Sequence, residues 1–394
     1  MKRALAVVLL LLTVLSMEGR RLPRYPFIRT DKNVLQGKSA DFQRFCSKLD
    51  TLLLTGGGDV RVLHVGGSHV QGGTLSDRLR RHFLSLRYGI EGGRGLVFPF
   101  ATAGTNTPVS YNSSYIGQWE SVNCLKPGDE ALGLTGMVAL ARDTSARVII
   151  DLKPRERTVL QQRYTFNRVD VLGDGTLEPL LLVNGRDTLH GIGTQGLRHF
   201  DLPHYTDWIQ LCFSGKGRYA LRGLYLDKSS GGFSLSEVGV NGASTQSWLR
   251  CDLWEQELRR VMPDLVIFSI GINDIQSADF DVRRFKANYR QLIARVRHAN
   301  PHCAILMSGI NDSWLRKKRV NPHTDAAEKA FRELAEECGG MFWDWYQVMG
   351  GYGSIAQWEE AGLAQGDKVH LTPAGYKLVG DLLFDAIMDA YYRR

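Results

Sequence analysis

One stretch of the chain, from about Ala101 to Gly232, lacks the helical spacing of apolar residues found on both sides of it. Before this stretch, a strand-like run ends in Gly66-Gly67 and a helical pattern follows from Thr74 to Leu86. After it, strand-like and helical runs alternate at 264–270, 281–298, 303–308, 324–338, 341–343 and 372–392. Strands that alternate with helices predict an α/β fold with a parallel sheet covered on both faces.

The middle stretch instead contains short β-rich runs separated by turn signals such as Asp174-Gly175 and Asn184-Gly185. Short strands with turns between them predict an antiparallel β-sandwich. We therefore expect a discontinuous α/β domain at 39–100 and 233–394, with an inserted β-rich module at 101–232. The 394 residues suit one large or two medium domains.

The N-terminus has the features of a secretory signal peptide over residues 1–18. Lys2-Arg3 precede a 12-residue apolar run that ends at Leu15, and the small residue Ser16 follows. The run is short for a membrane span, which needs about 20 apolar residues. We expect export to the periplasm or cell envelope, with an uncleaved anchor as the alternative.

The formal net charge of +8 includes two short basic clusters, Arg78-Leu79-Arg80-Arg81 and Arg316-Lys317-Lys318-Arg319. The simpler interpretation is that both lie on solvated helix faces. The alternative is attraction to an anionic polymer, such as a cell-wall glycan, or to lipid head groups. No zinc-finger spacing or long basic arm is present, so nucleic acid is not an expected partner.

The six cysteines are scattered and form no CxxC pair, so their spacing does not indicate metal ligands. We expect most of them to be reduced and buried. The chemistry described next needs no metal and no cofactor.

Four polar segments follow predicted strands or lie in a late loop, where ligands bind in an open α/β sheet. They are Gly66-Gly67-Ser68-His69, Gly239-Val240-Asn241-Gly242-Ala243, Gly271-Ile272-Asn273-Asp274 and Asp367-Lys368-Val369-His370. A nucleophilic serine needs a histidine base and an acid that orients the base. Ser68, His370 and Asp367 supply these three groups. The N–H groups of Ser68 and Gly242 and the side-chain amide of Asn273 are the candidate oxyanion donors.

The order of these segments resembles the SGNH (GDSL-type) hydrolase superfamily, whose four blocks contribute Ser, Gly, Asn and His. The resemblance covers about 60–74 and 235–394, and it implies a flavodoxin-like three-layer α/β/α fold. One residue departs from the pattern. The first block of the family usually contains Gly-Asp-Ser, whereas Gly67 stands here in place of the Asp. This change calls the rigidity of the nucleophile loop into question.

A narrower resemblance is to bacterial peptidoglycan O-acetyl esterases of this superfamily, which carry an inserted carbohydrate-binding-like β module. Ser68-His69, the Gly-Val-Asn-Gly-Ala segment and the place of the insertion carry this resemblance. It implies an esterase that removes O-acetyl groups from an envelope glycan, with acetylated peptidoglycan as the expected substrate. An O-acetyltransferase, an esterase of other acylated polysaccharides or lipids, and a non-catalytic glycan-binding protein remain alternatives.

The Gly-Ile-Asn-Asp sequence of 271–274 occurs again at 309–312. Asn273 follows Gly242 by about one strand–helix unit, as the family order requires, so it is preferred over Asn311 as the oxyanion donor. Asn311 is expected to line the cleft or cap a turn. His69 is interpreted as pocket wall or loop support, and His64 as a structural residue.

Overall fold

The computed structural model describes residues 25–153, 164–183, 185 and 187–394. The predicted signal peptide, 1–18, lies outside the described residues, and export therefore stays a prediction. Residue 184 of the predicted Asn184-Gly185 turn lies outside them as well.

A seven-stranded sheet forms the centre of the α/β domain, in the order β1-β21-β18-β17-β2-β16-β3. All neighbours are parallel except β1, which pairs antiparallel with β21. The strands are β1 (Leu35–Gln36), β2 (Asp59–Gly66), β3 (Gly92–Gly93), β16 (Gly232–Gly239), β17 (Leu265–Ser269), β18 (Ala304–Met307) and β21 (Met341–Trp343). Strands β16, β2, β17, β18 and β21 reproduce the flavodoxin-like order 2-1-3-4-5. The point where the strand order reverses lies between β2 and β17.

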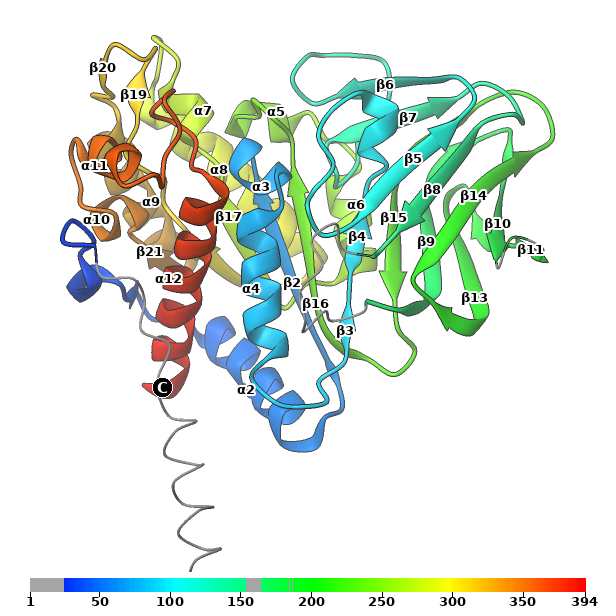
Figure 1. The fold of residues 1–394 in the computed structure, drawn as a ribbon, viewed down its shortest axis with the longest axis horizontal. Helices are drawn as coiled ribbons and strands as arrows, with labels where there is room; N and C mark the ends of the chain where they lie inside the picture. The colour runs from blue at the N-terminus through cyan, green and yellow to red at the C-terminus, as the bar shows by residue number, and fades with distance from the viewer. Residues whose placement is uncertain (1–24, 154–163, 184, 186) are drawn as a thin grey trace, which may run out of the picture.

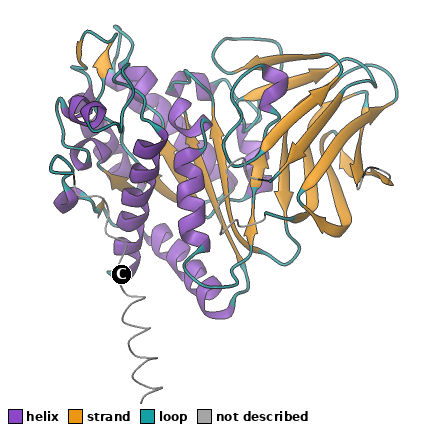
Figure 2. Cartoon of the chain, viewed as in Figure 1, coloured by secondary structure: helices purple, strands orange, loops and turns teal. Residues whose placement is uncertain are grey.

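Helices cover both faces of this sheet (Figures 1 and 2). On one face α4 packs beside α12, and on the other α8 contacts both α6 and α9. The helices are α2 (Ala40–Thr55), α3 (Ser68–Gln71), α4 (Thr74–Leu84), α5 (Thr245–Leu249), α6 (Trp254–Val261), α7 (Ile272–Ile275), α8 (Val282–Ala299), α9 (Thr324–Cys338), α10 (Trp345–Val348), α11 (Ser354–Glu360) and α12 (Pro373–Tyr392), with 3-10 turns at Thr30–Lys32 and Phe100–Ala103. Thr372 caps α12 by accepting a hydrogen bond from the Gly375 N–H, with Pro373 at the first helical position.

Two antiparallel sheets lie beside the α/β domain (Figure 2). One has the order β11-β10-β14-β8-β5, and the other β12-β13-β9-β15-β7-β6 with β4 paired to β15. The strands are β4 (Gly95–Val97), β5 (Asn112–Ile116), β6 (Trp119–Asn123), β7 (Met137–Ala141), β8 (Arg147–Asp151), β9 (Phe166–Gly175), β10 (Glu178–Val183), β11 (Asp187–His190), β12 (Ile192–Thr194), β13 (Gly196–Thr206), β14 (Trp208–Ser214) and β15 (Tyr219–Asp227). The ring of Phe213 on β14 contacts Tyr219 on β15 and Trp119 on β6, which joins the two sheets through their apolar faces.

The pairing of two short strands differs from the expected domain boundaries. Strand β1 belongs to the parallel sheet although it precedes residue 39, and β4 belongs to an antiparallel sheet although it precedes residue 101. The chain leaves the parallel sheet after β3 and enters the antiparallel sheets at Gly95, whose φ of 73° favours glycine. Two-residue and three-residue strands carry too little periodicity to be recognised in sequence. We therefore propose a split α/β domain that begins by Leu35 and an inserted module that begins at Gly95.

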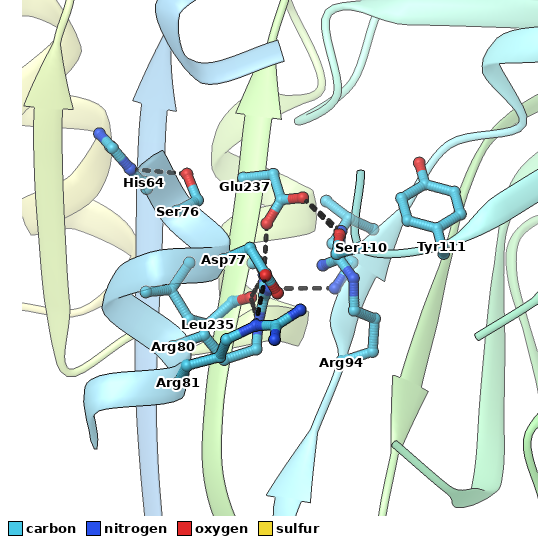
Figure 3. Close-up of polar contacts among 12 residues, drawn as sticks. His64, Ser76, Asp77, Arg80, Arg81, Arg94, Ser110, Tyr111, Leu235 and Glu237 are labelled. Carbon is cyan, nitrogen blue, oxygen red and sulfur yellow. Dashed lines mark hydrogen bonds and ion pairs between the residues drawn. The ribbon is translucent and has the colours of Figure 1, made fainter. Parts of the chain in front are cut away.

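A buried ionic cluster lies where β16, α4 and the β3–β4 connection meet (Figure 3). Glu237 on β16 pairs with Arg80 of α4 through one carboxylate oxygen and with Arg94 through the other. Ser110 donates a further hydrogen bond to Glu237 over 3.0 Å. Arg80 also contacts Asp77 one turn earlier. Arg80 thus lies in the interior, and the expectation that its basic cluster forms a solvated helix face is wrong for this residue.

The described helices are too short or too polar to cross a membrane. All six cysteines are described, and none forms a disulfide. Cys212 and Cys338 are partly exposed, whereas the other four are buried.

Candidate active site

Ser68 lies at the junction of β2 and α3, directly after two glycines. A Cβ on Gly66 would lie 2.3 Å from a methyl carbon of Val70 and 3.0 Å from the Ser269 carbonyl oxygen, so only glycine fits at this close approach. Val70 and Gln71 donate their N–H groups to the Gly67 carbonyl, which closes the turn. The tight turn places Ser68 at the first position of a helix at the carboxyl end of β2.

The side chains of Ser68, His370 and Asp367 form a continuous hydrogen-bonded chain. Ser68 Oγ lies 2.8 Å from His370 Nε2, and His370 Nδ1 lies 2.7 Å from Asp367 Oδ2. Ser68 and His370 are separated by 302 positions in sequence. When Nδ1 carries its proton toward Asp367, Nε2 is left free to accept the Ser68 hydroxyl proton.

Asp367 is fixed by its own backbone neighbours. Its Oδ1 accepts hydrogen bonds from the Val369 and His370 N–H groups, each over 2.9 Å. Partial burial raises the pKa of Asp367, but the hydrogen bonds from the His370 ring and from these N–H groups outweigh it, and the net pKa is lowered. The carboxylate is therefore ionised at neutral pH and can stabilise a protonated His370.

Asn273 lies at the N-terminus of α7 and next to the nucleophile turn. Its side-chain Nδ2 donates to the Ala243 carbonyl over 3.0 Å, and a Cβ on Gly67 would lie 3.0 Å from the same Nδ2. Gly242, adjacent to Ala243, has a φ of 84°, which L side chains rarely adopt. The structure thus brings the turn of Ser68, the loop of Gly242 and the amide of Asn273 together, as the four-block pattern predicts.

Gln71 connects the nucleophile helix to two other loops, a role that the sequence analysis missed. Its Oε1 accepts the Asn241 N–H over 2.6 Å, and its Nε2 donates to Thr105 Oγ1 and Asn106. Asn241 Nδ2 donates to Asn106 Oδ1 over 2.8 Å as well. The buried Gln71 amide therefore ties the short helix that begins at Ser68 to two neighbouring loops, in a turn where Gly67 replaces the usual Asp.

Asn311 is a second residue with a role that its sequence pattern did not predict. The side chain is fully buried, and its Nδ2 donates to the carbonyl groups of Asp312 and Val369 over 2.9 Å each. Val369 directly precedes His370. The repeated Gly-Ile-Asn-Asp sequence therefore places one asparagine beside the nucleophile and the other behind the histidine loop.

His69 forms part of the wall behind His370. The two rings have their centroids 5.4 Å apart, and His69 Nδ1 lies 2.6 Å from the Tyr376 hydroxyl. Burial, together with the neighbouring His370, lowers the pKa of His69 to about 3. The side chain is neutral at physiological pH and supports the loop, which agrees with the interpretation of His69 as wall or support.

His64 is buried in β2 beneath the site. Its Nδ1 lies 2.9 Å from Ser76 Oγ, as Figure 3 shows, and its Nε2 lies 2.8 Å from Ser269 Oγ. Burial, with a smaller effect of Arg80, lowers the pKa of His64 to about 3. Across the described part of the chain, no group of three His, Cys, Asp or Glu side chains has a metal-binding arrangement.

Residues 204–378 match the model of the GDSL-like Lipase/Acylhydrolase family. The chain also superposes with a TM-score of 0.78 on a solved structure entitled "Peptidoglycan O-acetylesterase in action, 5 min". The two chains are 21% identical, and the superposition covers 91% of this chain and 99% of the other. Residues 204–378 are therefore similar to GDSL-like acylhydrolases.

The superposition confirms the predicted fold class. The family-model match confirms the predicted resemblance and supports an SGNH-type ester hydrolase as the enzyme class. The family match begins within the inserted module, so it includes Gly242, Asn273, Asp367 and His370 but not Ser68. Ser68 is assigned by its sequence segment and by its hydrogen bond to His370. A structure of a family two carbohydrate esterase from Clostridium thermocellum also matches, with a TM-score of 0.32, 11% identity and coverage of 71% of this chain and 98% of the other. No curated protein matches the chain.

Proposed function

We propose that this chain is a serine esterase that removes O-acetyl groups from a cell-envelope glycan, with acetylated peptidoglycan as its substrate. The hydrogen-bonded chain from Ser68 through His370 to Asp367 is the observation that carries the proposal. The similarity of the whole chain, insertion included, to a solved peptidoglycan O-acetylesterase supports the choice of glycan. The predicted signal peptide supports action outside the cytoplasm.

The proposed reaction has two steps. His370 Nε2 takes the Ser68 proton as Oγ attacks the ester carbonyl, and the protonated imidazole then donates that proton to the departing sugar oxygen. The N–H groups of Ser68 and Gly242 and the amide of Asn273 stabilise the tetrahedral oxyanion. Water, deprotonated by the same histidine, then attacks the acetyl-enzyme, and His370 returns that proton to Ser68 Oγ as the acyl bond breaks and acetate leaves.

Asp367 has a positioning role in this scheme. Its carboxylate accepts a hydrogen bond from the Nδ1–H of His370, so that the unprotonated Nε2 faces the nucleophile as an acceptor. It also stabilises the imidazolium that forms when the Ser68 proton is transferred. Gln71 positions the loop of the oxyanion donor Gly242 through its bond to Asn241. Asn311 positions the loop of the base, His370, through its bond to Val369.

The test compares acetate release by the wild-type protein and Ser68→Ala from O-acetylated peptidoglycan, acetylated xylan and p-nitrophenyl acetate. The matched control is Ser47→Ala, because Ser47 is an exposed serine of α2. We expect release from peptidoglycan that is lost in Ser68→Ala and retained in Ser47→Ala. Equal release by Ser68→Ala would exclude the proposed nucleophile. Transfer of acetate to added glycan in place of free acetate would identify the transferase alternative.

A further inference from the structure

The second basic cluster forms the tip of a β-hairpin and not a helix face. Strand β19 (Trp314–Leu315) pairs antiparallel with β20 (Arg319–Val320). Arg316, Lys317, Lys318 and Arg319 are all exposed. We refer to residues 314–320 as the basic hairpin. The expectation of a solvated helix face at 316–319 is therefore wrong in its structure, and the alternative, an anion-binding role, gains a defined location.

The base of the basic hairpin is bonded to both loops that border the candidate active site. The Trp314 N–H donates to the carbonyl of Lys368, the residue after Asp367, over 2.9 Å. Gln276, which directly follows α7, donates its side-chain N–H to the Trp314 carbonyl over 3.2 Å. In Figure 1 the hairpin stands beside α7, on the same side of the molecule as α3 and α5. The four positive charges are therefore placed at the edge of the proposed esterase site.

These four charges have no acidic partner within the described residues. None of the four side chains lies within 4.0 Å of a described carboxylate, whereas the neighbouring Lys368 is paired with Glu359 at 3.2 Å. Four adjacent like charges repel one another, and this repulsion is relieved when an anion binds.

The backbone of the tip is strained as well. Lys318 N–H donates to the Leu315 carbonyl, which closes a turn whose central residues Arg316 and Lys317 have φ values of 51° and 58°. Such turns strongly prefer Asn and Gly, because both central residues need positive φ. The chain instead places two long cations there. Backbone strain of this kind is often retained at functional sites, and this turn borders the candidate active site.

We propose that the basic hairpin binds carboxylate groups on the glycan polymer whose ester the Ser68 site cleaves, so that the preferred substrate is an anionic glycan. This inference rests on the proposed esterase function. Arginine forms paired hydrogen bonds with a carboxylate, and lysine adds a compact positive charge. Because the hairpin is next to the reacting groups and not among them, it contributes to substrate binding. It therefore lowers KM and leaves the acyl-transfer steps to the Ser68 site.

The test removes charge from the tip without touching the bonded base. In Lys317→Ser/Lys318→Ser, KM for O-acetylated peptidoglycan, which bears carboxylates, is expected to rise about tenfold with kcat retained. Acetylated xylan free of uronic acid side groups, a neutral polymer, is the comparison substrate, and the ratio of kcat/KM for peptidoglycan to that for xylan is expected to fall about tenfold. Raising NaCl from 50 to 500 mM should remove most of the difference between wild type and variant, because salt screens exposed charges.

The matched control is Lys38→Ser/Lys216→Ser, which removes two exposed lysines outside the basic hairpin. We expect this control to keep the substrate ratio of the wild type. An equal loss on both polymers, or no loss on either, would overturn the proposal. Selective loss of binding to vesicles containing phosphatidylglycerol, with unchanged binding to peptidoglycan, would overturn it in favour of a lipid surface.

Failure of the esterase proposal can be separated from failure of the hairpin proposal. Cosedimentation with peptidoglycan, measured in the Ser68→Ala background, needs no turnover. Weaker cosedimentation of the hairpin variant would support the anionic-glycan site even if no acetate were released. Unchanged cosedimentation together with an unchanged substrate ratio would reject it.

Discussion

Asn311 donates a hydrogen bond from its side-chain amide to the backbone carbonyl of Val369, and so holds the residue immediately before His370. Its counterpart in the repeated sequence, Asn273, donates to the Ala243 carbonyl on the other side of Ser68. The two asparagines share a local sequence and differ in what they touch.

Replacing Asn273 should therefore mainly lower activity, whereas replacing Asn311 should mainly lower stability. Asn273→Ala removes a proposed oxyanion donor and is expected to lower kcat by about 10²–10³-fold with a small change in stability. Asn311→Ala leaves two buried carbonyl groups without their donor, which costs about 1–3 kcal/mol of unfolding free energy. Its kcat should fall about tenfold through misplacement of His370. Urea unfolding and p-nitrophenyl acetate kinetics measure both effects, and identical profiles for the two variants would contradict the assignment.

Asp367→Asn tests the tautomer of His370. The asparagine oxygen can still accept the two backbone N–H groups, but its NH₂ group would face His370 Nδ1 and favour the proton on Nε2. His370 would then be unable to accept from Ser68, and kcat is expected to fall by about 10³–10⁴-fold with the fold retained. Circular dichroism checks the fold, and acetate release checks the rate. A loss below tenfold would remove Asp367 from the proposed triad.

Glu237→Gln tests the buried ionic cluster. The change leaves the guanidinium groups of Arg80 and Arg94 buried without their shared counter-charge, and it is expected to cost about 3–5 kcal/mol of unfolding free energy. Glu120→Gln is the matched control, because Glu120 forms an ion pair with Arg142 on the surface. The control should leave the urea midpoint unchanged. Equal midpoints for both variants would show that the cluster contributes little.

The buried His64 predicts a loss of stability in acid. The unfolded chain binds a proton on this histidine near pH 6.5, whereas the folded pKa of His64 is lowered to about 3. Between these values the unfolded state holds more protons, so stability falls as the pH falls, by about 1.4 kcal/mol per pH unit for this one group. His64→Gln should reduce the slope of urea unfolding stability against pH between pH 4.5 and 6.5, and the remaining slope includes that of His69, whose pKa is also lowered to about 3. The exposed His204→Gln is the control and should leave the slope unchanged.

Long, strongly periodic elements were predictable from the sequence, and elements defined by pairing were not. The helix predicted at 324–338 is observed at Thr324–Cys338, because its apolar spacing and the following glycine define it locally. Strand β13 and the short β4 went unrecognised, since antiparallel partners and not their own patterns determine them. In the candidate site, the residues with intrinsic chemistry were predicted. Gln71 was missed, and Asn311 was expected to line the cleft or cap a turn and not to hold the loop of His370, because the roles of both residues depend on what lies around them after folding.

The position of β2 in the parallel sheet affects how the chain can assemble during its synthesis. Strand β2 is held between β16 and β17, and β16 begins at Gly232, after the whole of the inserted stretch. At ~5–20 residues per second, a ribosome needs roughly 10–30 s to pass from Gly66 to Gly232. Throughout this interval both edges of the nucleophile strand lack their partners, and the strands of the antiparallel sheets, which end with β15 at Asp227, are all made before β16. Strand β2 is therefore an extended apolar segment without partners during this period. A chaperone that binds such segments would protect it from aggregation until β16 is made.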